Sequence, residues 1–422
     1  MKGFFKARYH WVIAAIVLLE MFIYVGILNN INGLYIIPVS DTLGISRGDY
    51  SLAFSARALV GAVSVVVSAP ALRRFGYRKM GCFFLLVAAG AFAVLSASQN
   101  LFMLYLGTTL IGICEGTCLT SGATYIIGRW FHKYRGSVLG FVTAATGIGG
   151  SAVCILLTGI IQTSGWRLSL LVCAGMTGAV ALLIGLLIRD EPGHIGLKPF
   201  GEGEGQMGAK GQKDNWHGFP MERLVRMPGF YLAVLEVFLS CLALYIVFYA
   251  VVPYLQSRGF TSEEAASIQS IMLLAMAAFK LLTGVLSDWI GAKSTVGLCL
   301  GASVLSLYLL IRAETMPAAT VAVIVYSLGL PLTTVTVPLL SASLFGYSTH
   351  NRTSGIFFAM PALGAMIASP LASGVFDRVG SYLPAFNGAL LLSAAVFVLH
   401  LCVCCLANRE RKNLESTREE KV

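Results

Sequence analysis

The chain has 422 residues, of which 57% are hydrophobic and only 12% are charged, and its mean hydropathy is +0.78. Soluble domains carry roughly 25% charged residues, so this composition excludes an ordinary soluble domain and predicts an integral membrane protein. The formal net charge of +10 offers little support for nucleic-acid binding, because the distribution of basic residues follows the expected membrane topology.

Apolar stretches long enough to span a bilayer occur twelve times. A membrane-spanning α-helix needs about 20 apolar residues, whereas a barrel strand needs only about 9–11. The stretches therefore predict an all-α membrane protein. They cover residues 10–38, 50–72, 80–98, 101–128, 136–162, 166–188, 229–256, 265–287, 294–312, 317–345, 353–375 and 383–406.

The distribution of Lys and Arg predicts the orientation of these helices, because cytoplasmic loops carry an excess of both residues. With the N-terminus placed inside, most of the 30 basic residues fall on the cytoplasmic side. We therefore expect a multi-pass protein of the cytoplasmic (inner) membrane with both termini in the cytoplasm. The basic residues left outside are Arg47, Arg167, Arg258, Arg312 and Arg378.

One long polar stretch, residues 189–228, divides the helices into two sets. It is rich in Gly, Lys and Glu, which is typical of a flexible cytoplasmic linker. We expect it to connect an N-terminal six-helix half, residues 1–188, to a C-terminal half, residues 229–408. Residues 409–422 then form a cytoplasmic tail.

The two halves resemble each other at a nearly constant offset along the chain. Gly76 in the first half matches Gly291 in the second, and Glu20 matches Glu236 at almost the same separation. Paired halves of this kind are typical of repeat-built transporters, whose binding site lies near the middle of the membrane.

Two basic residues, Arg57 and Lys280, lie inside predicted spans. A cation near the bilayer centre costs about 2.5–3.5 kcal/mol on insertion scales, so it needs a cavity or a partner. For Lys280 we expect a cavity and an anion, and pairing with a buried glutamate is the alternative. Arg57 either reaches the outer surface or pairs with an acid, or it provides a second anion contact or an outer gate.

Three acidic residues, Glu20, Glu115 and Glu236, also lie inside predicted spans. Glu115 is close to the middle of its helix, so we expect a role in proton coupling or at the substrate site. A hydrogen bond to a neighbouring helix is the alternative. Glu20 and Glu236 lie towards the cytoplasmic ends of their helices, where gating or structural roles are expected.

Uncharged polar side chains add further candidates for the wall of a cavity. Asn32 shares a helix face with Asn29 at a spacing of three. Hydroxyl groups on apolar helices come from Tyr35, Tyr249 and Tyr326. We expect these residues to contact a substrate, although interfacial or packing roles explain any one tyrosine equally well.

No pattern in the sequence indicates catalysis or a bound cofactor. A P-loop, a Rossmann fingerprint and zinc-protease spacing are all absent. Cys114 and Cys118 share a helix face without further ligands, so packing thiols are expected and not a metal site. The six histidines fall in loops or near helix ends, which argues against a histidine proton relay. We therefore expect neither an enzyme nor a metal or other cofactor.

The turn Gly284-x-x-x-Asp288-x-x-Gly291-x-Lys293 resembles the cytoplasmic signature of the major facilitator superfamily. The resemblance implies twelve helices in two pseudo-symmetric halves. It also implies that Asp288 braces a neighbouring helix end and helps to gate the cytoplasmic side. The first-half copy departs from the signature, since Arg73 replaces the aspartate.

Finer segments resemble the branch of oxalate–formate antiporters and monocarboxylate transporters. They include residues 129–136, the Gly147-x-Gly149-Gly150 run, the Gly165-Trp166-Arg167 loop and residues 190–199. Together with segments in the eleventh helix they span most of the chain.

In this branch a cation eight residues before the eighth-helix aspartate binds the substrate carboxylate, and Lys280 and Asp288 have that spacing. Two departures restrict the implied role. Met276 stands where proton-coupled members carry an aspartate, and residues 356–374 lack the second cation of oxalate carriers. The resemblance therefore implies that Lys280 binds one carboxylate.

The implied function is secondary active transport by alternating access, as proton symport or anion exchange, by a monomer. The implied substrate is a small organic anion, namely a monocarboxylate such as lactate, pyruvate or formate. Two alternatives stay open: an exporter of a larger organic compound or drug, and a membrane sensor with a transporter fold.

Overall fold

A computed structural model describes residues 9–118, 120–132, 134–201, 224, 226–334, 340, 343–345 and 350–419. Within these residues the regular structure is helical, and the exception is an isolated parallel bridge between Phe131 and Phe200. The prediction of an all-α membrane protein is confirmed.

The chain forms two compact units. The first contains residues Met1–Lys210 and also the later segment Val251–Ala277, and the second contains Gly211–Ala250 and Ala278–Val422. The long helices α10 and α11 therefore each contribute one end to the first unit and the other end to the second.

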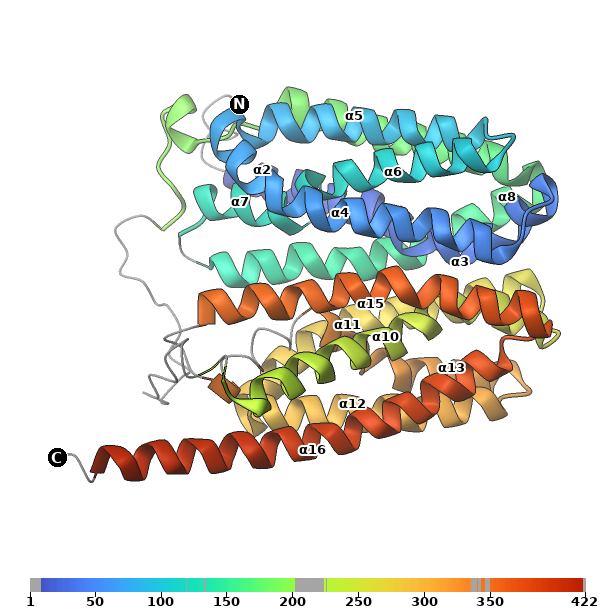
Figure 1. The fold of residues 1–422 in the computed structure, drawn as a ribbon. Helices are drawn as coiled ribbons and strands as arrows, with labels where there is room; N and C mark the ends of the chain where they lie inside the picture. The colour runs from blue at the N-terminus through green and yellow to red at the C-terminus, as the bar shows by residue number, and fades with distance from the viewer. Residues whose placement is uncertain are drawn as a thin grey trace. The chain divides into compact units, whose positions relative to one another are not determined.

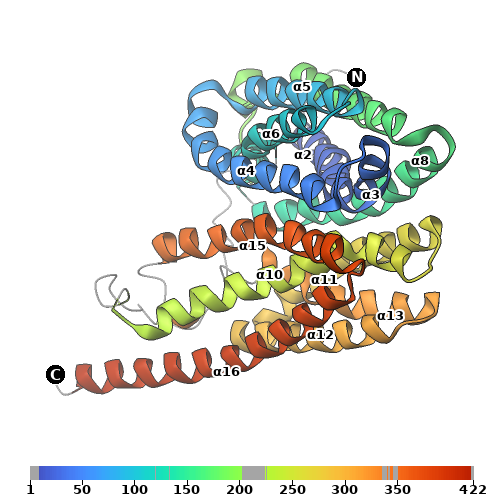
Figure 2. The same ribbon diagram turned by 45° about the vertical axis from the view of Figure 1, so that its right-hand side comes forward.

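The helices of the first unit pack in pairs along their length. In both ribbon views α4 runs beside α6, and α5 packs against both α6 and α8 (Figures 1 and 2). The elements are α2 (Tyr9–Glu20), η1 (Met21–Val25), α3 (Gly26–Leu43), α4 (Arg47–Phe75), α5 (Tyr77–Ser96), α6 (Leu101–Cys118), α7 (Thr120–Trp130), α8 (Arg135–Leu187) and η2 (Pro192–Ile195).

In the second unit, α12 packs against both α13 and α16 (Figure 1). The elements are α10 (Pro228–Ser257), α11 (Ser262–Ile290), α12 (Ala292–Arg312), α13 (Met316–Ser327), η3 (Leu330–Thr333), α15 (His350–Val379) and α16 (Leu383–Glu419).

The helices in the described residues account for twelve crossings. Ten stretches are long and apolar enough to span a membrane. One of them, Ser137–Leu187, is 51 residues long and holds two crossings, because Gly165 breaks the helix with φ 84° and ψ 162°. Helix α4 supplies the remaining crossing with its 29 residues.

Glycines with positive φ recur in the second half at the same separation along the chain that relates Gly76 to Gly291. They form three pairs with the same separation along the chain, namely Gly44 with Gly259, Gly76 with Gly291, and Gly165 with Gly380. Positive φ is costly for residues with a Cβ, so these glycines mark turns that both halves must make. The repeat therefore extends from sequence to backbone conformation.

The glycine run of α8 brings this helix against the start of α3. A Cβ at Gly26 would lie 2.8 Å from the carbonyl carbon of Gly149, and the Asn30 amide donates to the Gly150 carbonyl at 2.7 Å. In the second unit, a Cβ at Gly364 would lie 3.0 Å from the backbone nitrogen of Leu242. Small residues allow this close approach of backbones.

The first part of the expected linker packs against the first unit. The Trp130 indole donates to the Arg189 carbonyl at 2.8 Å, and Asp190 accepts from the Arg78 backbone N–H at 2.9 Å. The Phe200 carbonyl accepts from the His132 N–H at 3.0 Å. Residues 189–201 are thus held by hydrogen bonds, and the rest of the expected linker lies almost entirely outside the described residues.

Candidate functional site

A buried ion pair joins α4 and α6. Arg57 Nη1 lies 3.1 Å from Glu115 Oε1, and the two side chains are only 11% and 12% exposed. An ion pair with so little exposure needs close geometry to offset the desolvation of both charges. The structure thus brings two of the sequence-predicted residues together, and of the alternatives for Arg57 it selects the acidic partner.

Small residues let α4 and α6 approach closely around this pair. A Cβ at Gly112 would lie 2.5 Å from the backbone oxygen of Arg57. The Ser64 hydroxyl donates to the Gly112 carbonyl at 3.0 Å and accepts from the Gly116 N–H at 2.9 Å. The glycines on either side of Glu115 therefore determine how close its carboxylate comes to α4.

Tyr24 lies near the ion pair, and the sequence did not predict it. Its side chain is fully buried and interacts electrostatically with Arg57 and Glu115. Among the described residues its hydroxyl has no hydrogen-bond partner. Tyr24 belongs to the five-residue π-helix η1, and such bulges are frequent at functional sites. The sequence signal for Tyr24 is its position one helical turn after Glu20, an acidic residue inside a predicted span.

Glu20 lies in a second polar contact of the first unit. It is completely buried, and its Oε2 accepts a hydrogen bond from the Tyr77 hydroxyl. Tyr77 is the first residue of α5, directly after the Gly76 turn. Glu20 therefore ties the end of α2 to the start of α5.

Glu236 occupies the equivalent place in the second unit and has a histidine as its partner. His400 Nδ1 lies 2.7 Å from Glu236 Oε1, and His400 Nε2 lies 2.9 Å from the backbone oxygen of Lys293. His400 and Glu236 are almost fully buried, with 2% and 1% of their surface exposed. The sequence places His400 near a helix end and argues against a histidine proton relay, whereas the structure buries it within α16 beside a carboxylate 164 residues away.

Lys280 is half-buried on α11, within the membrane span Ser262–Ser287. The Thr283 hydroxyl bonds the backbone oxygens of Phe279 and Lys280, at 2.8 and 3.3 Å. Gly284 is one turn after Lys280, and a Cβ placed there would meet no described atom within 4 Å. The described residues therefore leave α11 open one turn from Lys280. The Asp288 side chain lies outside the described residues.

Two of the candidate tyrosines lie in the second unit with Lys280. The rings of Tyr245 and Tyr249 stack at 5.5 Å with an interplanar angle of 12°. Tyr249 is half-buried, whereas Tyr326 is 1% exposed and its hydroxyl donates to the Leu244 carbonyl. Tyr249 is thus the more exposed of these two candidate tyrosines.

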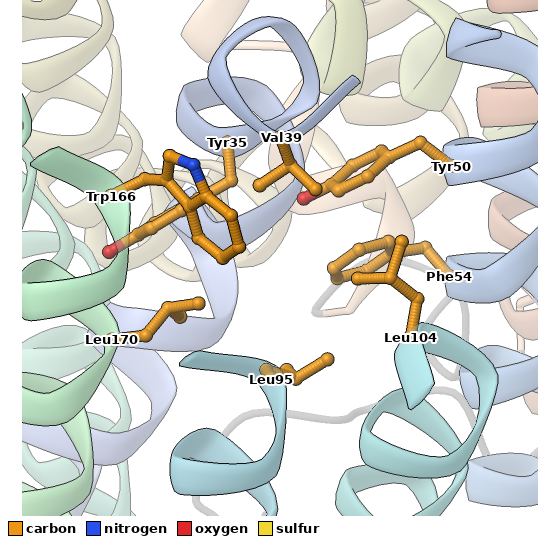
Figure 3. Close-up of a pocket in the computed structure, with 8 residues that line it drawn as sticks. All are labelled: Tyr35, Val39, Tyr50, Phe54, Leu95, Leu104, Trp166 and Leu170. Atoms are coloured by element: carbon orange, nitrogen blue, oxygen red, sulfur yellow. The ribbon is translucent and has the colours of Figure 1, made fainter. Parts of the chain in front are cut away.

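Tyr35 is in the first unit, where it lines a small apolar pocket together with Tyr50 and Trp166 (Figure 3). Its hydroxyl lies 2.5 Å from the Ser169 hydroxyl. The pocket offers only about 10 Å³, room for one water at most. The side chain of Asn32 is also buried, with 3% exposed. The structure thus places both residues inside the packed helices of this unit.

Among the described residues no group of three or more His, Cys, Asp or Glu side chains is arranged to hold a metal ion. The polar groups that the structure does bring together are pairs, namely Arg57 with Glu115, Glu20 with Tyr77, and Glu236 with His400. Such pairs can bind and release protons or counter a substrate charge.

Comparison with known proteins agrees with the fold. A model of the Major Facilitator Superfamily matches residues 13–261 and 233–422. The chain is 23% identical over 361 residues to monocarboxylate transporter 12 of Xenopus laevis, covering 78% of this chain and 75% of that protein. It is 20% identical over 304 residues to an MFS-type transporter of Gibberella moniliformis (strain M3125 / FGSC 7600), covering 69% of this chain and 65% of that protein.

Solved structures show the same architecture. The nucleoside transporter NupG aligns with a TM-score of 0.68 at 13% identity, covering 94% of this chain and 98% of that chain. A bacterial homologue of the human lysosomal transporter Spinster, solved in an inward-facing and unoccupied conformation, aligns with a TM-score of 0.68 at 15% identity. That alignment covers 96% of each chain. The chain therefore belongs to the Major Facilitator Superfamily, and it is a membrane transporter and not an enzyme.

Proposed function

We propose that this transporter moves a small organic monoanion, such as lactate, pyruvate or formate, across the cytoplasmic membrane by alternating access. The observation that carries the proposal is Lys280, a half-buried cation within a membrane span, on a helix that is open at Gly284. Ionisable groups at such depth usually mark the path of a substrate or ion. The similarity to a protein named as a monocarboxylate transporter supports the same substrate class.

The charges of the described residues favour one carboxylate over two. Glu115 lies 3.1 Å from Arg57 and balances its charge. Lys280 is the other basic residue inside a predicted span, and we assign it to the substrate. An ammonium group is a point charge without the fork geometry of a guanidinium, and one ammonium balances one carboxylate.

Tyr249 is the tyrosine that we assign to the substrate beside Lys280. Tyr326 contributes its ring, because its hydroxyl already donates to the Leu244 carbonyl. We assign structural roles to Tyr35 and Asn32, since both are buried and the pocket at Tyr35 has no room for an organic anion.

Glu115 is the residue that we assign to proton coupling. A proton on its carboxylate would cancel the charge that holds Arg57, so protonation and the geometry of α4 and α6 would change together. If Glu115 keeps its charge throughout the cycle, anion exchange is the expected mode. We assign Asp288, Glu20 and Glu236 to gating, and we propose a monomer with both termini in the cytoplasm.

Uptake by purified protein in liposomes tests the proposal. Labelled lactate, pyruvate, formate and oxalate are offered with and without a pH gradient. We expect uptake of monocarboxylates, a loss of at least tenfold in Lys280→Ala, and partial activity in Lys280→Arg, which keeps the charge. Lys198→Ala, at an exposed lysine outside the membrane spans, is the matched control.

Full carboxylate uptake by Lys280→Ala would show that Lys280 does not bind the anion. Transport of nucleosides or of large amphipathic compounds, without any carboxylate uptake, would replace the proposed substrate class.

A further inference from the structure

Glu236 and His400 join three helices of the second unit through two hydrogen bonds. Glu236 is on α10, His400 is on α16, and the Lys293 carbonyl that His400 contacts is in the first turn of α12. That turn follows Gly291, where the chain passes from α11 to α12 with φ 83°. The imidazole therefore connects the α11–α12 turn to a buried carboxylate.

The number of protons on the pair follows from its hydrogen bonds. A backbone carbonyl only accepts, so His400 Nε2 must carry a proton to bond Lys293 O at 2.9 Å. His400 Nδ1 and Glu236 Oε1 are 2.7 Å apart, and this contact needs one proton that either atom can hold. The pair thus shares a single proton and carries no net charge.

Removing the shared proton would leave one N–H on the imidazole for two acceptors, the Glu236 carboxylate and the Lys293 carbonyl. The charged carboxylate is the stronger acceptor. Nε2 would then be bare and would face the carbonyl oxygen, lone pair against lone pair, in a site with almost no access to water. Adding a second proton would keep the hydrogen bonds but leave a buried positive charge. Loss of the shared proton would therefore release the Lys293 carbonyl at the start of α12.

Other ionisable side chains of the described residues lie on α12 and α16, near this pair. The Cys404 thiol lies 3.6 Å from His400 Nε2. The Lys293 ammonium donates to Asn408 Oδ1 at 2.6 Å, and Glu410 lies further along α16, close to Gly229. None of these groups can replace the proton between the carboxylate and the imidazole.

The equivalent contact in the first unit lacks this property. Glu20 is the repeat counterpart of Glu236, and its partner is the Tyr77 hydroxyl. A phenol keeps its proton over the physiological pH range, whereas an imidazole exchanges one there. The two halves thus hold the same helix end with different chemistry.

We propose that Glu236 and His400 form a proton-binding site that holds the start of α12 in place while one proton is bound and releases it when that proton leaves. The site is independent of the proposed substrate and of the Arg57–Glu115 pair. The ligand of this site is the proton itself. Release of that proton would allow the α11–α12 turn to move.

Solid-state ¹⁵N NMR of the full-length protein in lipid vesicles, labelled at histidine, tests this site directly. His400→Gln identifies the His400 signals by their loss. We expect Nε2 to bear a proton while the shared proton is bound, and to lose it in one step as the pH is raised from 5 to 10, with the remaining proton then on Nδ1. Glu236→Gln should move that step to lower pH, because no carboxylate charge is left to hold the shared proton.

Glu20→Gln is the matched control, and it should leave the His400 titration unchanged. A correlation between the labelled imidazole and the Glu side chain in the unmutated protein supplies a second readout if a variant fails to fold. The proposal is overturned if His400 titrates identically in Glu236→Gln, if Nε2 is already bare at pH 5, or if the histidine–glutamate correlation is missing.

Discussion

Buried ionisable side chains in the described part of the first unit are tolerated because they have specific partners. Arg57 and Glu115 neutralise each other at 3.1 Å, and Glu20 accepts from the Tyr77 hydroxyl. Breaking a buried pair costs more than replacing it, since the remaining charge is left without compensation.

Arg57→Ala should lower the free energy of unfolding by about 3–5 kcal/mol, because it leaves the Glu115 carboxylate buried alone. The double variant Arg57→Met with Glu115→Leu should recover most of that loss, since it removes both charges. Denaturant unfolding followed by tryptophan fluorescence measures both. Equal destabilisation of the single and the double variant would contradict the role of the ion pair.

Tyr77→Phe should destabilise the protein by about 1–3 kcal/mol, because Glu20 then loses its buried donor. Tyr308→Phe, at a side chain that is 52% exposed, is the control and should change stability little. Thermal unfolding compares the two variants. A Tyr77→Phe melting temperature equal to that of Tyr308→Phe would show that the hydrogen bond contributes nothing.

At the scale of elements, glycines determine how closely the helices pack. A Cβ at Gly149 would collide with the backbone oxygen of Phe22, whereas a Cβ at Gly159 on the same helix would meet no described atom within 4 Å. Backbone atoms cannot move aside as a flexible side chain can. Glycine is therefore required at position 149 of α8 but not at position 159.

Gly149→Ala should reduce the yield of folded protein and its melting temperature by several degrees, because α8 must move away from η1. Gly159→Ala should be neutral or stabilising by up to about 1 kcal/mol, since alanine favours a helix more than glycine does. Size-exclusion profiles and thermal unfolding measure the difference. Similar behaviour of the two variants would contradict the close approach.

At the scale of the whole molecule, the chain repeats one six-helix plan twice. The segment Val251–Ala277 nevertheless belongs to the first unit, where the Gln269 amide donates to Asn30 Oδ1 at 3.1 Å and the Ser270 hydroxyl donates to the Ser151 carbonyl at 3.1 Å. Helix α11 thus carries both this contact and Lys280. Alternating access would require α11 to move relative to α8.

Cross-linking cysteines at Ser151 and Ser270 with a short bifunctional reagent should therefore abolish uptake but leave substrate binding intact. The background lacks the native cysteines, and the two single-cysteine variants treated alike serve as controls. Full transport by the cross-linked protein would show that this contact persists through the cycle.

Local chemistry made several features predictable from the sequence. The helices could be placed because every span must be apolar to enter the bilayer, and the turns at Gly76 and Gly291 because only glycine adopts their positive φ readily. Lys280, Arg57 and Glu115 stood out because a charge in an apolar span is expensive.

By itself, the sequence determined the membrane class, the repeat and the buried charges, since each follows from the cost of placing a residue type in lipid. Only the tertiary structure decided the partners. Glu20 meets Tyr77 across 57 residues, and Glu236 meets His400 across 164. Such pairs depend on which helix faces pack together, and packing is set by the shapes of distant segments and leaves no local pattern.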